Sequence, residues 1–230
     1  MRFLKKLLFL IVLYGSTAAA QEDSIISIQP GMDAKAVVRS AMYRYPHFMA
    51  GQVSFINGFS TKAQLNYNRF NGTMDYMDLK GDTLSITNIT DIKKVCIGKD
   101  TFYFSDGFLE QLYGSNDIKL AARQILKIAD KQKIGGLGLS SSTTNIESYE
   151  SYYDGRKINE LQINENLLMR LETIYYIGNQ QQAFLRASKK NLIKLFPEHK
   201  KAIETYLKEH IVKFNESSDL KELVIFLQNL

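Results

Sequence analysis

Closely spaced turn signals between residues 57 and 107 constrain this chain most strongly. Asn57-Gly58, Asn71-Gly72 and Asp106-Gly107 suit the positive-φ positions of tight hairpin turns, and glycines at 81 and 98 punctuate the same stretch. The runs between these turns are short, and their apolar residues alternate, as expected of strands with one buried face. The sequence therefore predicts sequence-adjacent antiparallel strands that form a β-meander or roll. The pairs expected to share a face are Val53 and Phe55, Leu65 and Tyr67, Met74 and Tyr76, Leu84 and Ile86, Val95 and Ile97, and Phe102 and Phe104.

The segment 118–130 is open between helix and strand. Its isoleucines and alanines follow a helical spacing, whereas Leu126 and Ile128 can share one face of a strand. Upstream, residues 21–32 have the composition of an irregular lead-in with a Pro30-Gly31 turn. Downstream, we expect strands at 158–163 and 167–177 and a short returning strand at 183–187. Tyr175 and Tyr176 should divide between the core and solvent faces.

The last 43 residues change character and predict helices. Ser188 can cap a short helix that ends before Pro197. A second helix over 198–210 would bury one stripe, and Ser218 or Asp219 can cap a third. We therefore expect an α+β fold in which an antiparallel β-meander or roll (21–187) is followed by a small C-terminal helical subdomain (188–230). The expected inward residues are Ile203, Tyr206, Leu207 and Ile211 in the second helix, and Leu220, Leu223, Val224 and Leu227 in the third.

The first twenty residues have the organisation of a secretory signal peptide. A basic head, Met1 to Lys6, precedes an apolar run, Leu7 to Tyr14, and a small-residue tail that ends at Ala20. The apolar run is shorter than the ~20 residues that a membrane-spanning helix needs. The sequence thus predicts export, with cleavage after about Ala20, to the periplasm or the outside of the cell. No other apolar stretch predicts a transmembrane segment in the mature chain.

Charge and cysteine content exclude several classes of protein. The chain has 29 basic and 24 acidic side chains, but Arg2, Lys5 and Lys6 belong to the leader, so 26 bases face 24 acids in the remainder. A near-neutral mature chain provides no strong field for nucleic acid, and we expect no nucleic-acid partner. The only cysteine, Cys96, allows no internal disulfide.

A Gly/Ser/Thr-rich segment, 135–145, predicts a loop, and tyrosines follow it. Tyrosine offers a large contact area at a small entropic cost, and functional contacts concentrate on loops. This segment is therefore the predicted contact surface. Its candidate binding residues are Gly135, Gly136, Gly138, Ser140, Ser141, Ser142, Tyr149, Tyr152 and Tyr153.

Other reactive side chains lack the spacing of known sites. His47, His199 and His210 form no HxH or HExxH pattern, so we expect no metal or other cofactor. Cys96 lies between two apolar residues and is expected to be an inert thiol. Asp75, Asp78 and Asp82 cluster around one predicted hairpin, either as solvated turn residues or as a pair of catalytic carboxylates.

Five stretches together carry a resemblance. They are YPHFMAGQVSFINGFSTKAQLNYN (45–68), GDTLSI (81–86), the Gly/Ser/Thr segment with its tyrosines (135–153), KKNLIKLFP (189–197) and DLKELVIFL (219–227). In these stretches the chain resembles an uncharacterised family of secreted proteins from Bacteroidetes, which has no assigned activity. The resemblance implies strand formers around 118–128 and supplies no catalytic residue.

These observations leave three hypotheses for function. The first is an exported, non-enzymatic protein that binds or scaffolds an envelope or extracellular partner. The second is a hydrolase of envelope glycans or peptides that uses the acids around Asp75 and Asp82. The third is a lipid carrier whose curved sheet encloses an apolar cavity.

We predict that the protein purified from its native cells begins at about Gln21, because a leader peptidase removes the preceding residues. Intact-mass measurement of the native product tests this. A product that keeps Met1 and stays inside the cell would contradict it.

Overall fold

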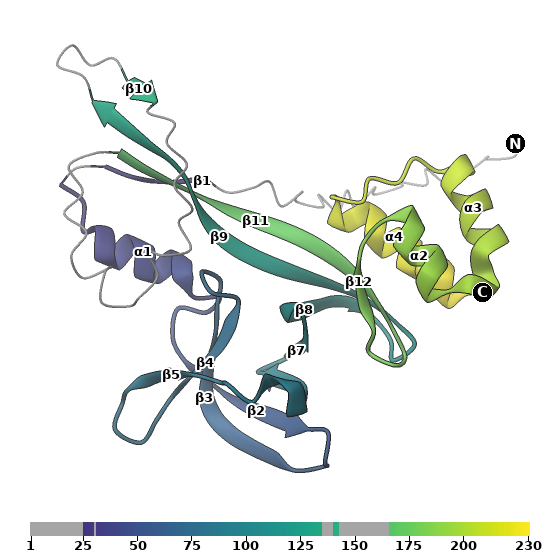
Figure 1. The fold of residues 1–230 in the computed structure, drawn as a ribbon, viewed down its shortest axis with the longest axis horizontal. Coiled ribbons are helices and arrows are strands. Elements are labelled where there is room, and N and C mark those ends of the chain that lie inside the picture. The colour runs from purple at the N-terminus through teal and green to yellow at the C-terminus, as the bar shows by residue number, and fades with distance from the viewer. Residues whose placement is uncertain (1–24, 30, 135–139, 143–165) are drawn as a thin grey trace, which may run out of the picture.

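The computed structural model describes residues 25–29, 31–134, 140–142 and 166–230, and its dominant element is one twelve-stranded antiparallel sheet (Figure 1). The main path of this sheet runs β1-β11-β9-β8-β7-β6-β2-β3-β4-β5, while β10 pairs with β9 and β12 pairs with β11. The strands are β1 (Ile25–Ile28), β2 (Met49–Phe55), β3 (Ser60–Asn68), β4 (Thr73–Met77), β5 (Thr83–Ser85), β6 (Ile92–Ile97), β7 (Asp100–Ser105), β8 (Gly107–Gly114), β9 (Ile118–Ile134), β10 (Ser140–Ser142), β11 (Asn166–Asn179) and β12 (Phe184–Arg186). The expected α+β class with a large antiparallel sheet is confirmed at this level.

The predicted hairpin turns are confirmed. The turn at Gly72, with φ 69°, joins β3 to β4, and the turn at Gly107, with φ 95°, joins β7 to β8. The order of the strands departs from a plain meander in one place, because β6 pairs with β2 and not with β5. Of the twelve side chains expected to lie in pairs on the buried face of a strand, eleven are buried or half-buried. Leu84 is the exception, since it is exposed on β5.

The segment 118–130 is a strand. β9 pairs along its length with β11 and, as far as Ala122, with β8. Ala122 packs in the cluster beneath the C-terminal helices, whereas Ala121 packs on the opposite face with Tyr103 and Leu109. Both faces are therefore covered, and small side chains fit there. Tertiary pairing overrides the helical spacing of the alanines.

The sheet curls so that the β3–β4 turn returns to β9. The Leu126 N–H donates to the Arg69 carbonyl (2.9 Å), and the Tyr67 hydroxyl donates to the Gln124 carbonyl (2.9 Å). This closure makes the sheet a roll, whose interior is filled by side chains from β2 to β8. The buried members are Tyr45, Val53, Leu65, Tyr67, Met74, Ile92, Val95, Ile97, Phe102 and Phe108.

Three C-terminal α-helices cover one end of the sheet (Figure 1). They are α2 (Lys189–Leu195), α3 (Lys200–Glu209), which follows a 3-10 turn (Pro197–His199), and α4 (Ser217–Gln228). The Ser188 hydroxyl caps α2 by accepting from the Asn191 N–H (3.2 Å), as predicted. The four expected residues of α4 and Ile203 of α3 are buried against β9 and β11, as shown by their cluster Ile118, Leu120, Tyr175, Ile177, Ile203, Leu220, Leu223, Val224 and Leu227.

Two helical expectations are wrong. Ile211 lies beyond the end of α3 and is 94% exposed. The cap of α4 is Glu216, which makes no side-chain cap bond, and the Asp219 carboxylate instead accepts from the Lys213 N–H (2.9 Å). That bond ties the connection before α4 to its first turn.

The N-terminal lead-in is also more regular than predicted. β1 pairs with β11, and Ile28 is buried against α1 (Ala34–Met42). The Asp33 carboxylate caps α1 by accepting from the Ala36 N–H (3.1 Å). The partner strand begins more than 130 residues further along the chain, so local sequence offers no sign of this pairing. Among the described residues, no helix combines the length and apolarity needed to cross a bilayer.

Tyr175 and Tyr176 point to opposite faces of β11, as predicted, but neither reaches solvent. Tyr175 is buried under the helices, and Tyr176 is buried with Phe184 of β12 on the other face. The β11–β12 hairpin therefore covers a face that the sequence suggested was exposed.

We predict that Gly114→Ala destabilises the protein far more than Gly81→Ala. Both glycines have positive φ, which costs a non-glycine residue about 1 kcal/mol or more. A Cβ at 114 would also lie 2.2 Å from the Ile118 carbonyl oxygen, whereas one at 81 would meet nothing within 4 Å. The free energy of unfolding in urea should fall at least ~2 kcal/mol further for Gly114→Ala. Equal losses would show that the β8–β9 turn is not closed in this way.

Candidate functional site

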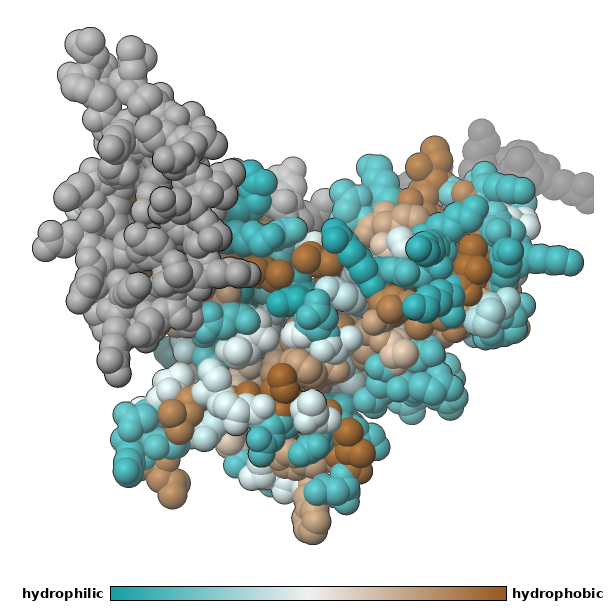
Figure 2. Space-filling model, in the orientation of Figure 1, coloured by the Kyte–Doolittle hydropathy of each residue, from teal (hydrophilic) through white to brown (hydrophobic). Residues whose placement is uncertain are grey.

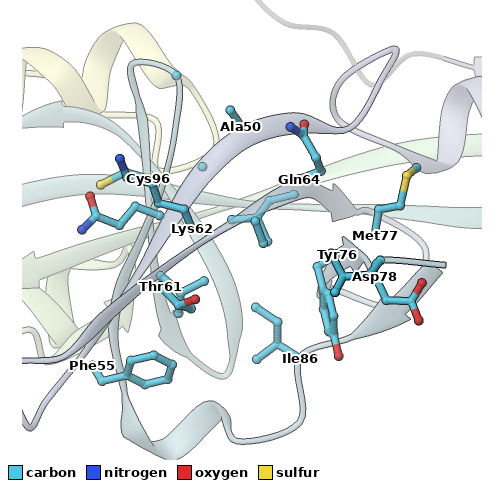
Figure 3. A pocket seen from close by; sticks show the side chains of 17 residues that line it. Ala50, Phe55, Thr61, Lys62, Gln64, Tyr76, Met77, Asp78, Ile86 and Cys96 are labelled. Atoms are coloured by element: carbon cyan, nitrogen blue, oxygen red, sulfur yellow. The ribbon is translucent and has the colours of Figure 1, made fainter. Parts of the chain in front are cut away.

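The roll opens at one end into a groove of about 1020 Å³ between the β2–β3 and β4–β5 hairpins. We call it the hairpin groove. Its floor continues the roll core, because Leu65 is fully buried and Phe55, Tyr76 and Ile86 pack partly buried against the same cluster. Figure 3 shows Phe55, Thr61, Ile86 and Tyr76 on one side of the β2–β3 ribbon, with Gln64 and Ala50 on the other.

The rim of the hairpin groove carries two exposed apolar side chains. Leu79 at the β4–β5 turn is fully exposed and Met77 is 40% exposed, and both line the groove. Ile56 and Phe59, at the tip of the β2–β3 hairpin, are exposed as well but do not line this groove. In Figure 2 brown, apolar side chains stand out among teal ones on the lower hairpins of the molecule. Turn tips of monomeric proteins are usually polar, so these exposed side chains form a candidate contact surface.

A buried network of hydrogen bonds around Asp75 holds the β4–β5 hairpin, which carries this rim. The Asp75 carboxylate is 3% exposed and accepts from the Thr73 and Ser85 hydroxyls (2.8 and 2.7 Å), from the Asn68 amide (2.9 Å) and from the Tyr43 hydroxyl (3.2 Å). These donors come from β3, β4, β5 and the end of α1. Asp75 therefore fixes the position of the β4–β5 hairpin.

A second polar cluster ties the chain after α1 to the sheet. Arg44 forms a two-pronged ion pair with Glu110 (2.9 and 3.1 Å), and the hydrogen bond to Glu110 raises the pKa of Arg44. Tyr45 donates to the Asp100 carboxylate (2.7 Å), and burial raises the pKa of its hydroxyl. Burial also raises the pKa of Tyr67 to about 12. Each of these groups has a partner inside the fold, which is Glu110 for Arg44, Asp100 for Tyr45 and the Gln124 carbonyl for Tyr67.

Two of the acids that the hydrolase hypothesis names, Asp75 and Asp78, have structural partners. Asp75 is committed to its four donors inside the fold. The Asp78 carboxylate accepts from the backbone N–H groups of Lys80 and Asp82 (both 2.8 Å) and so stabilises the exposed β4–β5 turn. Asp78 is the only acid among the described residues that line the hairpin groove. A single turn-capping carboxylate does not provide the pair that glycoside hydrolysis needs.

The predicted contact surface mostly falls outside the described residues. Gly135, Gly136, Gly138, Tyr149, Tyr152 and Tyr153 lie there, and the expected strand at 158–163 does too. Ser140, Ser141 and Ser142 form β10, which pairs with β9, so the loop expectation is wrong for these three. Their pairing extends the β9 edge, which explains why a Ser-rich run can be a strand.

The remaining reactive side chains have ordinary surroundings. His210 stacks on Tyr206 and its Nδ1 lies 3.1 Å from the Tyr206 carbonyl, and His199 lies beside Glu198. Cys96 is half-buried on β6, with its Sγ 3.9 Å from the Thr101 hydroxyl. Within the described residues, no group of three His, Cys, Asp or Glu side chains could hold a metal ion.

No family model, curated protein or solved structure matches this chain. The argument for binding therefore depends on the geometry of the hairpin groove. The sequence analysis missed the hairpin groove, although one signal was present. Leu79, which lines the groove, is a large apolar residue at a turn position where polar residues are usual.

We predict that Asp75→Asn lowers the free energy of unfolding by about 2 kcal/mol, because an amide cannot accept from all four donors and one buried group loses its charged partner. Asp82→Asn, on the exposed turn of the same hairpin, should change it by no more than ~0.5 kcal/mol. Urea titration monitored by tyrosine fluorescence measures both. Similar values for the two variants would refute the positioning role of Asp75.

Proposed function

We propose that this chain is an exported, non-enzymatic binding protein that uses the hairpin groove to hold an apolar part of a partner in the cell envelope or outside the cell. The observation that carries the proposal is the open apolar groove with its exposed Leu79 and Met77 rim. Export rests on the leader pattern of residues 1–20 and on the resemblance to secreted proteins.

Several features of the groove support binding over catalysis. Its volume is that of ordinary ligand sites, and its apolar floor is anchored in the packed core. A floor of this kind is rigid, so a partner would lose little free energy in ordering it. The apolar rim would be costly to leave in water, at roughly 25 cal/mol for each Å² that a partner could cover.

The groove differs from the cavity that a lipid carrier would need. It is open to solvent along its length between two hairpins, and the interior of the roll behind it is filled by side chains. An open, rigid trough suits a segment of a partner protein. The Gly/Ser/Thr segment with its tyrosines, 135–153, stays a sequence-based prediction of a further contact surface.

We predict that a Met77→Asp, Leu79→Asp double variant loses capture of the envelope partner, because it places two charges on the rim of an apolar interface. Both side chains are exposed, so the melting temperature should change by less than ~2 °C. The matched control is Ile211→Asp, which adds a charge at an exposed isoleucine by the C-terminal helices, at the other end of the molecule (Figure 1).

The measurement is quantitative pull-down from a solubilised envelope fraction with wild-type and variant proteins side by side. Partners retained by the wild type and by Ile211→Asp, and lost by the double variant, support the proposal. Equal capture by all three proteins would overturn the role of the groove. Binding of a fluorescent fatty acid by the wild type and not by the double variant would instead favour a lipid ligand.

A further inference from the structure

A second groove, of about 610 Å³, lies where three hairpin turns converge on the sheet. The β2–β3, β8–β9 and β11–β12 turns form its walls, and Lys94 of β6, Tyr103 of β7 and Lys119 of β9 contribute from the strands between them. We call it the lysine groove. It shares Gln52 and Phe55 with the hairpin groove, so the β2–β3 hairpin separates the two.

All the charged side chains that line the lysine groove are positive among the described residues. Lys93, Lys94 and Lys119 line it, and none of the described lining residues is acidic. Neither Lys93 nor Lys94 forms an ion pair with any residue of the described chain. An anion entering the groove would therefore meet positive charge that the protein itself does not neutralise.

Lys119 is the most unusual of the three lysines, since it is 3% exposed. Its ammonium donates to the Asn116 carbonyl, lies 3.5 Å from the Asn179 carbonyl and stands 5.8 Å from the ring centroid of Tyr103. Burial lowers the pKa of Lys119, and attraction by Asp117 opposes this. A buried lysine seldom has so little compensating charge around it, and a bound anion would add to the attraction by Asp117.

The walls of the groove provide neutral polar groups and an exposed ring. Gln52, Asn116 and Gln180 are exposed amides and Gln182 is a half-buried one, and each is able to donate and to accept. The Phe59 ring is 74% exposed at the edge of the groove. Hydroxyl groups need paired donors and acceptors of this kind, and the C–H face of a sugar ring packs on an aromatic ring.

One of these amide residues, Gln182, has a strained backbone conformation. Gln182, at φ 60°, is the one non-glycine residue with positive φ in the described part of the chain. The turn is held by the Gln182 N–H, which donates to the Asn179 carbonyl (3.0 Å), and by the Asn179 side chain, which accepts from the Ala183 N–H (3.0 Å). A glycine would adopt this conformation without strain, so glutamine here points to a use for its side chain.

We propose that the lysine groove binds an acidic saccharide, with Lys94 facing its carboxylate, the buried Lys119 adding positive charge behind it, the amides bonding its hydroxyls and Phe59 packing on a ring face. The volume fits a short oligosaccharide. Phosphate-bearing ligands are favoured less, because no arginine lines the groove among the described residues and lysine lacks the two-pronged geometry of guanidinium.

The test is isothermal titration calorimetry of the purified protein with trigalacturonate, with neutral maltotriose and with inorganic phosphate. We expect trigalacturonate to bind, maltotriose to bind much more weakly or not at all, and the affinity for trigalacturonate to fall as salt is raised. Lys94→Gln should weaken trigalacturonate binding about tenfold. Lys208→Gln, which makes the same charge change on the exposed face of α3, should leave it within about twofold.

A second variant separates binding from stability. Gln182→Gly relieves the positive φ, so the melting temperature should stay the same or rise, while loss of the amide should weaken trigalacturonate binding about threefold. The proposal is overturned by absence of trigalacturonate binding, by equal binding of maltotriose, by binding of inorganic phosphate alone, or by equal effects of Lys94→Gln and Lys208→Gln.

Discussion

Pairing of the β3–β4 turn with the free end of β9 is the constraint on which the rest of the structure depends. β8 covers β9 only as far as Ala122, so the following residues of β9 would present unpaired backbone groups. The bond from the Leu126 N–H to the Arg69 carbonyl and the bond from the Tyr67 hydroxyl to the Gln124 carbonyl fill that edge. Because the edge is filled by a turn from the far side of the sheet, the meander becomes a roll with a closed, apolar interior.

This closure also decides where polar groups are buried. Arg69 reaches β9 through the Gln124 side chain (3.1 Å), and Arg123 lies against the glycines of two turns, Gly72 and Gly107. Any larger side chain at those two turns would meet the Arg123 guanidinium. Burial lowers the pKa of Arg69, with a smaller contribution from the nearby Arg44, so this charge is held at a cost that the hydrogen bonds of the closure offset.

The roll closes at one end and leaves the β2–β3 hairpin projecting at the other. One side of this hairpin continues the apolar core and forms the floor of the hairpin groove. The other side faces Lys94 and Tyr103 in the lysine groove. The alternation of side chains along a strand thus gives one hairpin an apolar groove on one side and a lysine-lined groove on the other.

The sequence by itself determined the hairpins between residues 57 and 107 and the helices after Ser188, because Gly-containing turns and capped apolar stripes depend on residues only a few positions apart. Neither groove could be found that way, since Phe55 meets Ile86, and Lys94 meets Lys119, only after distant strands pair. The strand at β9, the pairing of β1 and the burial of Tyr176 were likewise decided by tertiary structure. The local sequence of β1 has only a weak structural preference, and that of β9 favours a helix. Both segments are strands because their backbone groups bond to partners dozens of residues away in the chain.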